Sequence, residues 1–160
     1  MFLLGHIGIT VFISSFLYIQ PSFAFIAILL PDFVDKLLLL IGVATYNRFI
    51  AHTIFFGPIA SLIVYAATKR KDLSLATLSV CYLHLLEDAK DFLPLFYPLV
   101  KYSFPEAGFG LEFDWFTIAT EGLGILLLAA TVLWYPKILK IREKIFSKVI
   151  YSKKNKIIKR

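Results

Sequence analysis

Residues 84–91, "HLLEDAKD", combine one imidazole with three carboxylates at the end of an apolar run. His84, Asp88 and Asp91 are spaced by four and three residues, which places them on one face of a helix. The same kind of spacing recurs in Asp32 with Asp35, Arg48 with His52, and Asp114 with Glu121. Imidazole nitrogen together with carboxylate oxygen is a ligand mixture that suits zinc, manganese or iron. These spacings therefore favour a divalent metal site.

The composition makes so many titratable groups costly. The chain is 59% hydrophobic, above the roughly 45–50% of soluble domains, which indicates an integral membrane protein. An ionisable group inside a bilayer costs roughly 2.5–3.5 kcal/mol unless it pairs, lines water or binds a cation. Three histidines that are mostly neutral at pH 7 cannot neutralise this many acids, whereas a divalent ion can.

The elements that must position these groups are predicted to be transmembrane helices. Apolar stretches cover residues 2–19, 23–43, 49–68, 73–86 and 113–135. Backbone groups at membrane depth have no water to bind, so the fold class is all-α, a multi-pass transmembrane helical bundle. The first stretch lacks a basic start and is expected to be retained rather than cleaved. Residues 92–112, rich in aromatics, proline and glycine, predict an interfacial loop with short helical pieces.

The positive charge divides the chain into a membrane domain, residues 1–136, and a basic amphipathic tail, residues 137–160. Basic clusters at residues 69–71 and in the tail predict a cytoplasmic side and anionic lipid head groups as partners, not nucleic acid. The expected location is the plasma (inner) membrane, and a homo-oligomer is compatible with the sequence.

The polar groups are predicted to share one depth near the outer face. At 1.5 Å per residue, His6, Asp32, His52, His84 and Glu121 lie about 17–27 Å from the inner turns. Every histidine of the chain belongs to this layer. The predicted metal site therefore lies near the outer interface.

Each motif also has a plainer interpretation. Pro31 and Asp32 could start a helix, Arg48 could reach lipid head groups, and His52 could be a buried histidine with one hydrogen bond. His84 with Asp88 could be a helix-end ion pair. Glu87 and Lys90 are expected to be solvated. Glu121, inside an apolar span, is expected to support a histidine or share a proton. Asp114 either does the same or marks the interface.

The ordered motifs resemble a known family. "GHIGIT", "LLPDFVDK", "NRFIAHT", "YLHLLED" and the following "FYP" resemble the membrane-bound metal-dependent hydrolases, small inner-membrane proteins that include a bacterial member induced by DNA damage. The resemblance covers residues 5–98, with a weaker echo at Asp114. It implies a metal site built from His6, Asp32, Asp35, His52, His84 and Asp88. The family usually has a glycine after the arginine that corresponds to Arg48 and a serine after the central histidine, and both are missing here: Phe49, Ile50 and Ala51 fill the gap between Arg48 and His52, and Thr53 replaces the serine.

The sequence and this resemblance together predict a metal-dependent hydrolase that cleaves a phosphoester-type bond in a lipid or lipid-linked substrate. One or two ions are expected, zinc first and manganese or iron as alternatives. Arg48 would bind phosphate, and Asp91 or Glu121 would act as general base or orienting group. The alternatives are an ion or metal transporter and a non-catalytic protein whose metal clips helices together.

Overall fold

The chain folds into helices joined by turns and loops, which confirms the all-α prediction. The computed structural model describes residues 3–17, 19–105 and 114–158, with side chains up to residue 145 and for Ser147. The elements are α1 (Leu3–Phe16), α2 (Pro21–Leu40), the 3-10 helix η1 (Ile50–His52), α3 (Phe56–Thr68), α4 (Lys71–Glu87) and α5 (Trp115–Ile158). Residues 92–105 contain no helix, although short helical pieces are predicted there, and 106–112 lie outside the described residues.

Helix α2 carries two of the predicted site residues on one continuous element. It begins at Pro21, whose fixed φ suits a first turn where a backbone N–H has no helical partner. Pro31 lies inside the helix and does not start a new one. Asp32 and Asp35 are therefore held one turn apart on a rigid rod. Gly42 follows with a φ of 77°, the left-handed region that glycine enters freely.

The apolar stretch at residues 49–68 does not form a single span. Only its second part is α3, while its first part is a loop that contains η1. The cause is the carboxylate of Asp35, which accepts backbone N–H groups from Phe49 and Ala51 at 2.5 and 2.9 Å. These bonds hold the segment against α2 in a non-helical path.

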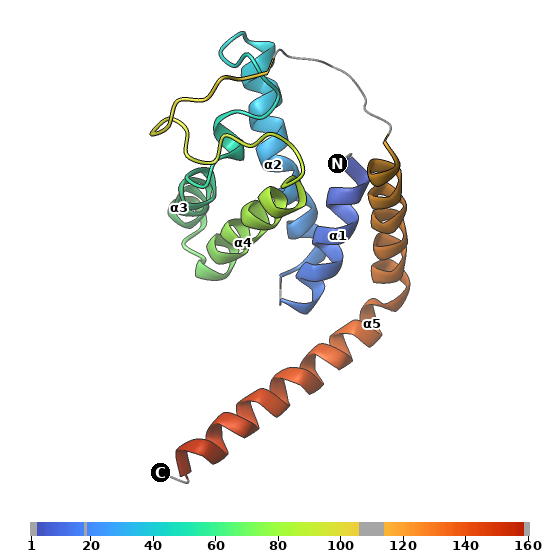
Figure 1. Ribbon diagram of the computed structural model, residues 1–160. Helices are drawn as coiled ribbons and strands as arrows, with labels where there is room; N and C mark the ends of the chain where they lie inside the picture. Colours follow the sequence, from blue (N-terminus) through green and yellow to red (C-terminus); the bar gives the residue numbers. More distant parts are fainter. Residues whose placement is uncertain (1–2, 18, 106–113, 159–160) are drawn as a thin grey trace.

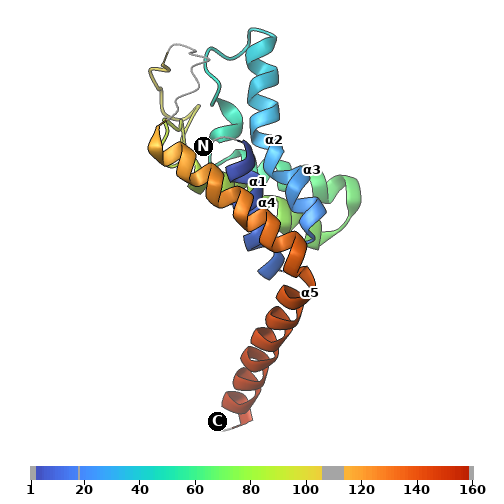
Figure 2. The ribbon, with the colours of Figure 1, turned by 90° about the vertical axis from the view of Figure 1, so that its right-hand side faces the viewer.

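Two helical hairpins meet at the centre of the molecule. Helix α1 contacts α2, α3 contacts α4, and α2 contacts α4 across the join (Figure 1). The first half of α5 lies along α1, on the side away from α3 (Figures 1 and 2). The C-terminal end of α1, the α3–α4 turn and the bend of α5 lie at one end of the molecule, whereas residues 41–55 lie at the other.

Glycines let α1 and α5 approach until their backbones touch. A Cβ on Gly8 would overlap the carbonyl group of Gly124, and a Cβ on Gly124 would lie 2.5 Å from the Cα of Gly5. Small residues at a helix crossing permit such close packing. Since His6 lies between the two glycines of α1, this crossing fixes its height beside α4.

Helix α5 runs through Pro136 without a break, although the sequence predicts a separate tail helix. Proline removes one backbone hydrogen bond and clashes with the preceding turn, which kinks a helix. The helix changes direction at this level, and its second half leads away from the rest of the molecule (Figures 1 and 2).

One described helix is long and apolar enough to cross a membrane, over Trp115–Ile145 of α5. Helices α1 and α3 have 14 and 13 residues, fewer than the roughly 20 that a span needs. Helix α2 has 20 residues but carries Asp32, Asp35 and Lys36. The described helices therefore contain one candidate span, where the sequence predicts several.

Candidate metal centre

Three side chains from three elements bring ligand atoms to one point. Nε2 of His52, in η1, lies 3.2 Å from Nε2 of His84, in α4, and 3.5 Å from Oδ1 of Asp32, in α2. The same oxygen lies 3.8 Å from Nε2 of His84. Ligands that share one zinc ion at about 2.0–2.2 Å lie roughly 2.8–3.6 Å apart at coordination angles of about 90–110°. Two of the three distances fall in this range and the third is slightly longer, so this first triad could hold a metal ion.

Asp88, at the C-terminal end of α4, links the first triad to a second. Its Oδ2 lies 3.5 Å from Nε2 of His52 and 3.9 Å from Nε2 of His84. Its Oδ1 lies 3.0 Å from Nε2 of His6. The second triad consists of His6, His84 and Asp88, all buried. Because the triads share His84, the centre could hold one ion or two. Asp32 is 23% exposed, so the centre is accessible from the side of this residue.

Asp35 lies behind His52 and belongs to neither triad. Its Oδ2 accepts a hydrogen bond from Nδ1 of His52 at 2.7 Å, in addition to the two backbone N–H groups. Because an ionised carboxylate only accepts, Nδ1 carries the proton and Nε2 faces the triad. Metal-binding histidines are commonly oriented by such a carboxylate. The sequence predicts Asp35 as a metal ligand, whereas in the structure its carboxylate is hydrogen-bonded to His52 and to two backbone N–H groups and lies outside both triads.

His52 lies in the connection between α2 and α3, outside the long helices. Burial disfavours a charged ring, but hydrogen bonds with Asp32, Asp35 and Asp88 outweigh burial and raise the pKa of His52 to about 10. The same carboxylates that favour a proton on the ring would also favour a metal cation at Nε2, so a proton and a metal ion would compete for this atom.

Asp35→Asn is expected to weaken metal binding about 10–100-fold, the usual effect of losing the partner of a ligating histidine. An amide NH₂ in place of Oδ2 would face two donors, so the His52 ring would turn or adopt the other tautomer. Competition with a chromophoric chelator measures the affinity. Asp91→Asn, in a 32% exposed acid outside both triads, is the control and should bind metal as the wild type does. Equal affinities of Asp35→Asn and wild type would contradict the assigned role.

Glu87 orients His6 in the same way, and the prediction that it is solvated is wrong. Its Oε2 accepts from Nδ1 of His6 at 2.7 Å, and its Oε1 accepts from the hydroxyl of Thr10 at 2.9 Å. The Glu87 side chain is 5% exposed. The signal was present in the sequence, since Glu87 is three residues after His84 and Thr10 is four after His6, both on shared helix faces. Lys90, in contrast, is exposed as expected.

Arg48 lies at the edge of the centre between two carboxylates. Its Nε donates to Oδ2 of Asp88 at 2.8 Å, and its Nη2 donates to Oδ2 of Asp91 at 2.6 Å. Arg48 is mostly buried, while Asp91 is partly exposed. The guanidinium of Arg48 thus links the buried carboxylate of Asp88 to the partly exposed carboxylate of Asp91.

The loop after α4 covers the segment that carries Arg48 and His52. The backbone N–H of Ile54 donates to the carbonyl oxygen of Leu95 at 3.0 Å. The ring of Phe49 contacts the rings of Tyr97 and Phe104, with centroids 5.0 and 5.5 Å apart. These contacts shield the centre from the loop side.

Glu121 and Asp114 lie away from the triads. The sequence predicts that Glu121 supports a histidine, but its Oε1 accepts the backbone N–H of Gly5 at 3.0 Å, because the close crossing brings the start of α1 to α5. Asp114 accepts the N–H of Thr117 at 2.8 Å at the start of α5 and pairs with Lys90. The hydrogen bond from Lys90 holds the pKa of Asp114 below its usual range.

The ligand atoms of the centre come from α1, α2, η1 and α4, so the centre joins both helical hairpins. No protein-family model, curated protein or solved structure matches the chain.

Proposed function

We propose that the chain is a membrane-embedded metal-dependent hydrolase that cleaves a phosphoester-type bond in a lipid or lipid-linked substrate. The observation that carries the proposal is the first triad, where Asp32, His52 and His84 direct ligand atoms to one point inside a mostly apolar helical protein. The ordered motifs that resemble membrane-bound metal-dependent hydrolases support the same proposal.

The donor set fits a first-row divalent ion. Asp32, His52 and His84 would hold one ion, and His6, His84 and Asp88 are the residues that would hold a further ion. Zinc suits two imidazoles with carboxylates, and manganese and iron accept the same donors. An ion bound there would supply Lewis acidity and hydroxide near neutral pH.

Arg48 is the group assigned to the phosphate. A planar guanidinium binds phosphate oxygens through two parallel N–H donors and stabilises charge that develops on them. A phosphate arriving from the exposed side of Asp91 would compete with that carboxylate for Nη2 of Arg48. Asp91 would then act as general base and accept the proton that the attacking water loses.

Exposed apolar side chains support placement in the membrane. Ile26 of α2, Leu62 of α3, Leu75 of α4 and Leu126 of α5 are each more than 60% exposed. Soluble monomers rarely expose contiguous apolar patches larger than a few hundred Å². In the proposal, α1–α4 enter the bilayer beside the candidate span of α5. The basic turn at residues 69–71 faces the cytoplasm, and the metal centre lies toward the outer face.

Purified protein is expected to hydrolyse at least one substrate from a panel of phospholipids and polyprenyl phosphates, and to lose this activity with a chelator. Added zinc or manganese should restore turnover. Asp32→Asn, which weakens a ligand, should lower turnover at least about 100-fold, while Asp72→Asn, an exposed acid paired with Arg70, should leave it unchanged. Retained metal without metal-dependent turnover on any member of the panel would favour a metal that only clips the helices together.

A further inference from the structure

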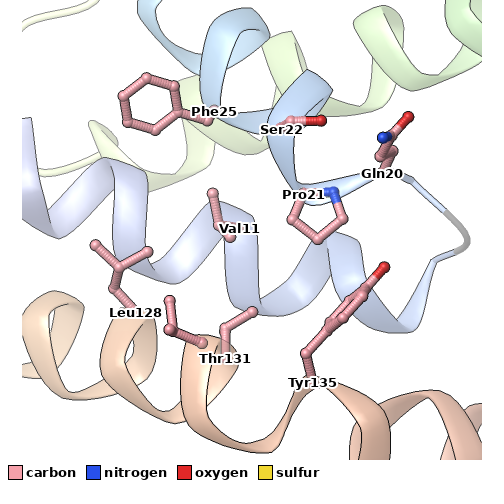
Figure 3. Close-up of a pocket in the computed structure, with 9 residues that line it drawn as sticks. Val11, Gln20, Pro21, Ser22, Phe25, Leu128, Thr131 and Tyr135 are labelled. Atoms are coloured by element: carbon pink, nitrogen blue, oxygen red, sulfur yellow. The ribbon is translucent and has the colours of Figure 1, made fainter.

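A cavity opens between α1, the start of α2 and α5, apart from the metal triads (Figure 3). Its volume is about 440 Å³, within the range of roughly 300–1,000 Å³ typical of ligand pockets. The α5 wall consists of Leu128, Thr131, Val132 and Tyr135, spaced three and four residues apart on one helix face. Val11 of α1 lies between this wall and α2.

The cavity is apolar inside and polar at one end. Phe25, on the α2 side, and Val132 are both exposed, so the cavity is open to its surroundings. Gln20, Ser22 and Tyr135 supply polar groups at the start of α2 and the end of the α5 wall, whereas the hydroxyl of Thr131 donates to the carbonyl oxygen of Leu127 within α5 (Figure 3). An elongated ligand would fit if its apolar part contacts the apolar lining and its polar head lies beside Gln20, Ser22 and Tyr135.

Basic side chains follow the polar end of the cavity. Lys137 and Lys140 are exposed just after Tyr135 on α5. Nη1 of Arg142 donates to the carbonyl oxygen of Ser15, in the last turn of α1, at 3.5 Å. The sequence between residues 137 and 147 has one acid, Glu143, against four basic residues. A negatively charged head group would therefore be attracted to this end.

We propose that this cavity binds one acyl chain of an anionic phospholipid whose phosphate group is attracted by the positive field of the basic residues that follow Tyr135 on α5, among them Lys137 and Lys140. Juxtamembrane basic residues attract anionic lipids by about 1 kcal/mol each. The basic turn at residues 69–71 lies at the same end of the molecule, which adds to the positive field (Figures 1 and 2). The bound chain fills the gap between α1 and α5 and stabilises their contact.

This lipid is a bound ligand and not the substrate. Pro21 lines the cavity, whereas Asp32 belongs to the first triad, and 11 residues of helix place them about 17 Å apart. The inference depends on the membrane placement in the proposed function, but not on the metal chemistry. The two proposals can therefore fail separately.

The test is thermal unfolding of the delipidated full chain in detergent, with added dioleoyl phosphatidylglycerol or dioleoyl phosphatidylcholine. Wild type should gain at least twice as much in Tm from the anionic lipid as from the neutral one. Val132→Trp fills the cavity and should lower the gain from the anionic lipid at least threefold. Leu133→Trp is the matched control, because Leu133 is the next residue, is also 72% exposed and does not line the cavity. It should keep the wild-type gain.

Two further variants complete the test. Ser22→Phe fills the cavity from α2 and should repeat the loss if Val132→Trp fails to fold. Lys137→Gln with Lys140→Gln should reduce the gain from the anionic lipid to that from the neutral lipid. Equal gains from both lipids in wild type, or the same gain in Val132→Trp and Leu133→Trp, would overturn the proposal. The metal content of the cavity variants should equal that of wild type. If wild type itself contains no metal, that result counts against the proposed hydrolase and not against the lipid site.

Discussion

His84→Ala is expected to remove nearly all bound metal from the purified protein, because His84 is the residue that both triads share. Binding of a structural zinc ion is worth about 10–16 kcal/mol, so one of four ligands contributes about 2.5–4 kcal/mol, or roughly 10²–10³ in affinity. The metal content should fall from about one or two ions per chain to less than about a tenth of that. Elemental mass spectrometry of the dialysed protein measures it.

Two other variants separate the triads and control for general damage. His6→Ala removes a ligand of the second triad alone, so the ion between Asp32, His52 and His84 should remain. Leu83→Ala changes the neighbouring half-buried side chain and should leave the metal content at the wild-type value. If His84→Ala and Leu83→Ala bind the same amount of metal, the assigned centre is wrong.

The helix-period spacing of the polar residues contained most of the information about the centre. Spacings of three and four on an α-helix place His84 and Asp88 on one face, and the apolar stretches around them predict the helices themselves. Counting residues from the turns then places His6 and Asp32 at a common height. The structure brings these four and His52 together around two overlapping triads.

The division of roles among the carboxylates could not be predicted in this way. Asp32 and Asp35 share a helix face, and which of them faces an ion depends on the path of residues 49–52. That path is set by backbone hydrogen bonds to Asp35, a contact between segments far apart in sequence. Glu87 is similar, because its burial depends on α1 lying against α4 and delivering His6 and Thr10.

The position of α5 was equally hidden from local patterns. In the sequence, nothing distinguishes Gly5 and Gly8 from other glycines of an apolar helix. Glu121 lies in an apolar span, so the sequence predicts that its carboxylate pairs with a histidine. Their roles appear only when α1 and α5 cross, more than 100 residues apart in sequence, and the N–H of Gly5 meets Glu121. Periodicity within one helix contains no signal for which other helix it crosses.

Gly124→Ala is expected to force α1 and α5 apart and to destabilise the protein strongly. The new Cβ would lie 2.5 Å from the Cα of Gly5 and 2.6 Å from the carbonyl oxygen of Leu4. Neither backbone atom can rotate away as a side chain could. We expect a cost at the upper end of the usual 1–3 kcal/mol for overpacking, or a Tm lower by roughly 5–10 °C.

Gly122→Ala is the matched control, two residues away on the same helix, because a Cβ there meets nothing within 4 Å. Replacing an exposed helical glycine by alanine stabilises by about 0.5–1 kcal/mol, so this variant should unfold at a slightly higher temperature than wild type. The two variants differ only in whether α1 lies against the new methyl group. Since His6 is next to Gly5, Gly124→Ala should also weaken metal binding at the second triad while the first triad keeps its ion. Equal stability of both alanine variants would mean that the backbones of α1 and α5 do not touch at this crossing.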